Sequence, residues 1–120
     1  MHKIHFYKTA DGKAPVTEYM SELASRTDKD SRIKLNKIRD HIKALSVYGT
    51  AIGAPKVKHL EGDIWELRPL RDRILFVAWV DGGYVLLHPF MKQTQKTPPR
   101  EIEQAKREFA DWKERNSDHE

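Results

Sequence analysis

The chain has 120 residues, a length that favours one domain over residues 1–120. It contains no cysteine, which excludes a disulfide framework and a thiolate zinc site. No segment approaches the roughly 20 consecutive apolar residues of a membrane span, so we expect a soluble, cytoplasmic protein with no membrane partner.

The formal net charge of +4 is distributed unevenly along the chain. From Glu101 onward there are seven acidic and four basic residues, a net charge of −3, so the first hundred residues carry +7. A basic body followed by an acidic segment is typical of a protein that binds a polyanion. The same charge also fits a simple role in solubility, and only the motifs distinguish the two.

The N-terminal half predicts one strand and two helices. Strand-forming residues at positions 3–8 indicate a strand, and Pro15 suits the first turn of a short amphipathic helix. A second helix is expected to begin near Thr27, with Asp30 completing a capping box, and to end at Gly49. Its apolar stripe is Leu35, Ile38, Ile42 and Leu45. Its opposite face is basic and carries Arg32, Lys34, Lys37, Arg39 and Lys43.

The C-terminal half predicts three strands after a loop at residues 50–56. The strand-like runs are residues 64–69, 73–80 and 84–90. The first alternates like an edge strand, whereas the second is apolar on both alternations and should be a central strand. Asp81-Gly82-Gly83 predicts a tight hairpin between the last two.

A final amphipathic helix is expected to follow Thr97 as N-cap and Pro98 as first residue. The tail, residues 116–120, has no apolar anchor and is expected to fray. The fold class is therefore α+β, with two helices, a small and mostly antiparallel four-stranded sheet, and a C-terminal helix.

Short motifs follow one another in the second half of the chain. They are Trp65-Glu66-Leu67-Arg68, then Arg73-Ile74, then Leu87-His88-Pro89-Phe90 with Lys92, then Lys96-Thr97-Pro98 and Ala105. In this order they resemble the RelE/ParE superfamily of toxins, and within it the HigB-like, phage-derived RelE-like branch. The resemblance covers nearly the whole chain and implies helices on an antiparallel sheet with a concave basic surface. Members often have two adjacent lysines after the Phe, whereas here Gln93 follows Lys92.

The resemblance also implies a function and partners. It implies the toxin of a type II toxin–antitoxin system that cleaves mRNA, often in the ribosomal A site. Neutralisation would come from a helix-turn-helix, HigA-like antitoxin, and operator DNA would be bound only through that antitoxin. The antitoxin is expected to dock on the two-helix region Val16–Leu45 or to cover the catalytic groove directly. Two alternatives remain, a ParE-like inhibitor of DNA gyrase and a nucleic-acid-binding module without catalysis.

Metal-independent RNA cleavage uses the 2′-hydroxyl as nucleophile, so the protein mainly stabilises negative charge on phosphate, and we expect no cofactor or metal. Arg68 ends one predicted strand and Arg73 opens the next, so the two guanidinium groups should be neighbours, with Lys92 nearby. Glu66 and His88 are the candidates for proton transfer. Each has a structural alternative, because Glu66 would also hold an arginine and a histidine in an apolar strand often only forms hydrogen bonds.

Three further basic residues, Lys58, Arg71 and Lys96, are predicted to bind RNA. Arg73 is expected at the rim of the sheet, where its removal would leave the fold intact. Four aromatic residues are candidates for base stacking, but their periodicity favours packing in the core. They are Trp65, Phe76, Trp79 and Trp112.

Overall fold

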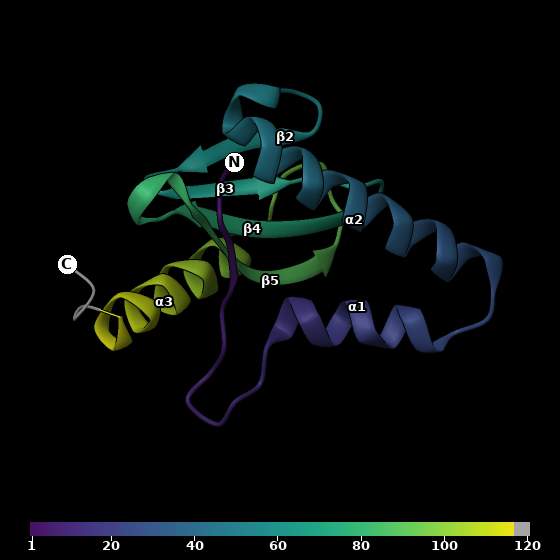
Figure 1. Ribbon diagram of the computed structural model, residues 1–120, viewed down its shortest axis with the longest axis horizontal. Helices are drawn as coiled ribbons and strands as arrows, with labels where there is room; N and C mark the ends of the chain where they lie inside the picture. Colours follow the sequence, from purple (N-terminus) through teal and green to yellow (C-terminus); the bar gives the residue numbers. More distant parts are fainter. Residues whose placement is uncertain (117–120) are drawn as a thin grey trace.

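The computed structural model describes residues 1–116. Five strands form one mixed sheet in the order β1-β5-β4-β3-β2 (Figure 1). β1 runs parallel to β5, and the other neighbouring strands are antiparallel. The strands are β1 (Ile4–Phe6), β2 (Val57–Glu61), β3 (Ile64–Leu67), β4 (Asp72–Ala78) and β5 (Tyr84–Met91). The α+β class is confirmed, with one strand more than the sequence predicts.

The additional strand, β2, is the edge strand next to β3. Its sequence has little apolar alternation, and of its residues only Val57 is buried. Its pairing with β3 creates the strand, placing Lys58 opposite Glu66. β3 is therefore an interior strand. Its prediction as an edge strand is wrong because β2, whose polar sequence does not predict a strand, pairs with its outer side.

Helices cover both faces of the sheet (Figure 1). α1 (Pro15–Ser25) and α2 (Lys29–Tyr48) form an antiparallel pair on one face, and α3 (Pro99–Arg115) lies on the other. β4 contributes to both hydrophobic clusters, Ile74 and Phe76 on the α1–α2 side and Leu75 and Val77 on the α3 side. This confirms the prediction that β4 is a central strand covered on both faces.

The helix ends differ from the prediction by one residue. Asp28, and not Thr27, caps α2, and its carboxylate accepts a 2.9 Å hydrogen bond from the backbone N–H of Ser31. Pro98 is the N-cap of α3 and Pro99 its first residue, so the predicted start at Thr97 is one position too early. The predicted end of α2 at Gly49 is confirmed, with Gly49 at a φ of 64° that suits glycine. Within the predicted frayed tail, residues 117–120 lie outside the described residues.

The two N-terminal helices are attached to the start of β4 through a buried carboxylate. Asp72 is 2% exposed, and its Oδ1 accepts a 2.8 Å hydrogen bond from the Tyr19 hydroxyl of α1. Lys34 of α2 places its Nζ 3.6 Å from the same oxygen. Since Arg73 follows Asp72, the helix pair fixes the backbone from which that arginine projects. No helix within residues 1–116 is long and apolar enough to cross a membrane.

Candidate nucleic-acid interface

Two arginines meet at the end of the β3–β4 ladder. Leu67 pairs with Ile74, so the next residues along the two strands, Arg68 and Arg73, lie side by side. Their Nε atoms are 3.6 Å and 3.8 Å, respectively, from the same oxygen, Oε1 of Glu66. The structure thus brings these two guanidinium groups together, as the sequence predicts.

Glu66 is buried beneath the arginine pair, with 2% of its surface exposed. While Oε1 faces the arginines, Oε2 accepts a 2.5 Å hydrogen bond from the hydroxyl of Thr97. Thr97 precedes α3 and is 31 residues away in sequence, so no local sequence pattern predicts this contact. A carboxylate held in this way favours the positioning role of Glu66 over a role as general base.

Arg73 is buried, and the prediction that it is a rim charge is wrong. Only 6% of the residue is exposed, because its guanidinium lies over the connection between β3 and β4. Its Nη1 donates hydrogen bonds of 2.8 Å to the carbonyl oxygens of both Leu70 and Asp72. Burial lowers the pKa of Arg73 and the charge of Arg68 lowers it further, while the carboxylates of Glu66 and Asp72 oppose both effects.

Arg68 is the more accessible of the two, with 26% of its side chain exposed. Its Nε is buried yet makes no hydrogen bond within the part of the chain that the structure describes. That Nε faces Oε1 of Glu66 at 3.6 Å, so it is paired by charge with the buried carboxylate. Arg68 is therefore the more accessible guanidinium, whereas Arg73 uses Nη1 to hold the backbone.

The arginine pair opens into a narrow hollow of about 20 Å³. Six charged side chains line this hollow together with the β5–α3 connection, and they are Lys58, Glu66, Arg68, Arg73, Lys92 and Lys96. Wider depressions adjoin it, one of about 630 Å³ from Phe90 to Glu101 and one of about 550 Å³ that includes Arg71. The hollow itself has room for about one water molecule, so a phosphate within an extended chain would lie at its mouth, against the basic side chains that line it.

The basic residues around the arginine pair come from three separate segments. Lys58 belongs to β2, the strand that the sequence did not predict. Arg71 belongs to the β3–β4 connection, and Lys92 and Lys96 belong to the β5–α3 connection. The backbone N–H of Lys92 donates a 2.8 Å hydrogen bond to the carbonyl oxygen of Arg71. This bond fixes the start of the β5–α3 connection against the β3–β4 connection. All three predicted RNA-binding residues line the hollow or an adjoining depression.

His88 does not line the hollow. It is 3% exposed, and both ring nitrogens contact glutamates of α3, Nδ1 at 2.6 Å from Glu108 and Nε2 at 3.0 Å from Glu101. Burial alone would lower the pKa of His88, but the hydrogen bonds and charges of Glu108 and Glu101 outweigh it, so the pKa is raised. These contacts favour the structural alternative for His88, as a connection between β5 and α3.

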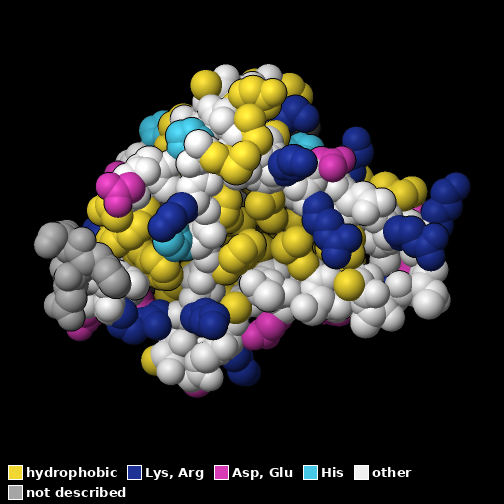
Figure 2. Space-filling view, viewed as in Figure 1, with side chains coloured by type: hydrophobic (Ala, Val, Ile, Leu, Met, Phe, Trp, Pro, Cys, Tyr) yellow, Lys and Arg dark blue, Asp and Glu magenta, His cyan; other side chains and the backbone are white. Residues whose placement is uncertain are grey.

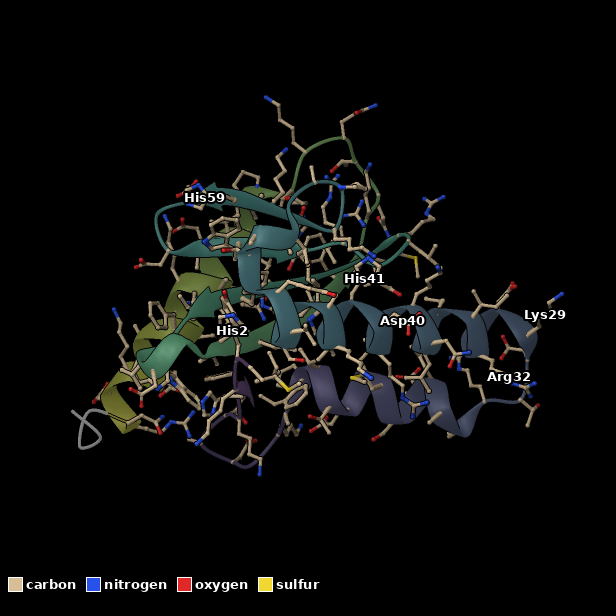
Figure 3. All side chains as sticks on the ribbon, turned by 45° about the horizontal axis from the view of Figure 1, so that its top comes forward. His2, Lys29, Arg32, Asp40, His41 and His59 are labelled. Atoms are coloured by element: carbon tan, nitrogen blue, oxygen red, sulfur yellow. The ribbon has the colours of Figure 1, made fainter. Side chains whose placement is uncertain are left out.

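Three further histidines lie in separate parts of the fold. Figure 3 shows His2, His41 and His59 at separate places on the molecule. His59 contacts the carbonyl oxygen of Gly62 at 2.7 Å. Residues 1–116 contain no group of three or more His, Asp or Glu side chains arranged to hold a metal ion.

The four aromatic candidates pack against the core, as their periodicity predicts. Phe76 is fully buried, and Trp65 stacks against it with ring centroids 6.3 Å apart. Trp79 and Trp112 of α3 meet edge to face, with their ring centroids 5.9 Å apart. Phe90 lies beside the arginines; it is half-buried, pairs with Arg73 and lines both the hollow and the larger depression. Phe90 was not among the predicted site residues, although its position before Lys92 was a usable signal.

A family model described as "Phage derived protein Gp49-like (DUF891)" matches residues 25–110. The match spans α2, strands β2 to β5 and most of α3, and it includes all the charged residues of the hollow. No curated protein matches the chain. The matched family is one of RelE-like toxins of toxin–antitoxin systems, in agreement with the superfamily that the sequence motifs resemble. The chain therefore belongs to the Gp49-like family of phage-derived, RelE-like toxins.

Proposed function

We propose that this protein is a HigB-like toxin of a type II toxin–antitoxin system that arrests translation by cutting mRNA on the ribosome. The observation that supports the proposal is the pair Arg68 and Arg73, placed over Glu66 in one hollow with three lysines. Such a concentration of fixed positive charge matches an RNA phosphate that gains negative charge during cleavage. The wider depressions that adjoin the hollow leave room for the nucleotides before and after that phosphate.

The proposed reaction is an internal transesterification of the RNA chain. The 2′-oxygen gives its proton to solvent water and forms a bond to the adjacent phosphorus, and the bond from phosphorus to the 5′-oxygen breaks. Arg68 donates to the phosphate oxygens as negative charge develops, while Arg73 adds fixed positive charge and keeps the connection rigid. We assign to Lys92 the proton that the departing 5′-oxygen requires. The products are a 2′,3′-cyclic phosphate and a 5′-hydroxyl, and no metal ion takes part.

Dependence on the ribosome and the choice of partners follow from the family resemblance. The ribosome would present mRNA in the extended form that an open groove accepts. A HigA-like helix-turn-helix antitoxin would neutralise the toxin, and operator DNA would be bound only through that antitoxin. These partners are tested by inducing the toxin with and without the product of the adjacent gene.

Brief induction followed by mapping of the 5′ ends of cellular mRNA tests the proposal directly. Discrete new ends within translated regions, with a 5′-hydroxyl on the downstream fragment, are the expected result. A 5′-phosphate would show that water attacked, and the mechanism would be wrong. Intact mRNA together with an early stop in DNA replication would replace the proposal with gyrase inhibition. RNA binding without growth arrest or cleavage would leave only a nucleic-acid-binding module.

A further inference from the structure

Three exposed hydrophobic side chains gather beside the arginine pair. Ile33 of α2, Leu70 of the β3–β4 connection and Met91 at the end of β5 are 40%, 50% and 47% exposed. Together with Asp30, Lys34 and Arg71 they line a groove of about 280 Å³. We call Ile33, Leu70 and Met91 the apolar patch. Clustered exposed apolar side chains with a charged rim are typical of a protein-binding site.

Leu70, one of the three patch residues, has an unfavourable backbone conformation that the fold holds in place. Its φ of 56° lies in the left-handed region, where glycine is the ordinary residue. A leucine there is disfavoured, and its half-exposed side chain gains little from the core. Arg73 nevertheless holds this backbone through the 2.8 Å bond to the Leu70 carbonyl oxygen. Unfavourable backbone that is held firmly is characteristic of ligand-binding segments.

The surroundings of the patch are basic. Residues 29–37 of α2 contain four basic residues and one acidic residue. Figure 3 shows Lys29 and Arg32 projecting from the first turns of this helix, and Figure 2 shows Lys and Arg side chains along its exposed face. Lys34 is already engaged by the buried Asp72, but Arg71 is exposed on the opposite side of the groove. A partner with acidic residues around an apolar segment would complement both features.

The patch also overlaps the nucleic-acid interface. Leu70 and Arg71 line both the groove of the patch and the depression of about 550 Å³ beside the hollow. Met91 lines the larger depression. A chain segment bound to the patch would therefore cover part of the path that an extended RNA requires.

We infer that the apolar patch is the docking site for an apolar segment of the cognate antitoxin with acidic flanking residues, and that this segment and RNA exclude one another. The inference rests on the proposed function, since it assigns the antitoxin to one face and gives the way it inhibits. The sequence suggests the helix region Val16–Leu45 as the dock. Of that region, the groove of the patch includes only residues in the first turns of α2. RNA alone does not match the apolar side chains, and a second copy of this chain would bring like charge to a basic rim.

A matched pair of variants tests the dock. Ile33→Asp and Val47→Asp introduce the same charge on the same helix, at positions 40% and 38% exposed, and only Ile33 belongs to the patch. The probe is the small helix-turn-helix protein encoded by the adjacent gene, titrated against each purified variant. We expect Ile33→Asp to raise the Kd at least about 30-fold, and Val47→Asp to leave it unchanged. Co-expression of the antitoxin should then rescue growth from wild type and Val47→Asp but not from Ile33→Asp.

The possible results separate the dock from the proposed function. Equal Kd values for the two variants would overturn the docking site, even if the protein is an active toxin. Concentration-dependent dimerisation of the isolated toxin that Ile33→Asp abolishes would assign the patch to a second copy instead. Stable binding of a single-stranded RNA oligonucleotide by the toxin–antitoxin complex would overturn mutual exclusion. Conversely, harmless induction with intact mRNA would refute the toxin function, while the difference in Kd would still establish the dock.

Discussion

Arg73 donates a hydrogen bond from Nη1 to the carbonyl oxygen of Leu70 over 2.8 Å. This bond ties the start of β4 to the connection that precedes it, and a second 2.8 Å bond reaches the carbonyl oxygen of Asp72. The two neighbouring arginines therefore have different roles. Arg73 maintains the shape of the site and supplies charge, whereas Arg68, with 26% of its side chain exposed, is the more accessible to a ligand.

Arg73→Ala is expected to destabilise the protein as well as abolish RNA cleavage. The substitution removes two charge-assisted hydrogen bonds and leaves the buried Glu66 with less compensating charge. We expect the free energy of unfolding to fall by about 3 kcal/mol. Urea unfolding measures this loss, and Arg73→Lys should recover only part of it because an ammonium group does not match both carbonyl oxygens. A variant as stable as wild type would contradict the structural role.

Arg68→Ala should separate activity from stability. Its side chain is 26% exposed and, unlike that of Arg73, holds no backbone carbonyl oxygen within residues 1–116, so the loss of stability should be smaller than for Arg73→Ala, about 1 kcal/mol. Cleavage should fall by about 10²–10³-fold, the usual effect of removing one group that stabilises a developing anion. Arg26→Ala is the matched control, since Arg26 is 56% exposed and pairs with Glu22 of α1. Toxicity that survives Arg68→Ala would remove this residue from the mechanism.

His88 should make stability depend on pH in a defined direction. Its pKa in the folded protein is raised above the ordinary value of 6.5, so its contribution is fully present below pH 6.5 and is lost as the pH rises through the raised value. His5 and His41 have lowered pKa values and act in the opposite direction, since their contribution is lost as the pH falls below 6.5. Thermal melts of wild type and His88→Gln across this range should differ most at low pH. A constant difference would show that the imidazolium is not the stabilising form.

Trp65→Ala should fail through loss of folding rather than loss of chemistry. Trp65 packs against the buried Phe76 and contacts the His59 ring at 5.0 Å. Truncation of an aromatic side chain that packs on the core costs about 3 kcal/mol. Residual folded protein should keep the cleavage activity of wild type per folded molecule. Equal melting temperatures for Trp65→Ala and wild type would show that this side chain is not part of the core.

The helices, four of the five strands and the meeting of the two arginines could all be predicted from the sequence. Each of these depends on residues close together in the chain. Apolar spacing defines the buried face of a helix, and a short connection between paired strands forces Arg68 and Arg73 to be neighbours. The α+β class followed from the order of these local elements.

The burial of polar groups and the contacts they make depend instead on how distant segments pack together. β2 is a strand because β3 offers it a partner, and its polar sequence gives no independent signal. Thr97 reaches Glu66 across 31 residues, and His88 is held by Glu108 across 20. Such contacts arise where α3 packs on the sheet, because a buried polar group must be paired with whichever groups the packing brings within reach. Local sequence patterns do not indicate which groups those are. For this reason the sequence predicts Arg73 as an exposed charge at the rim of the sheet, whereas the structure buries it.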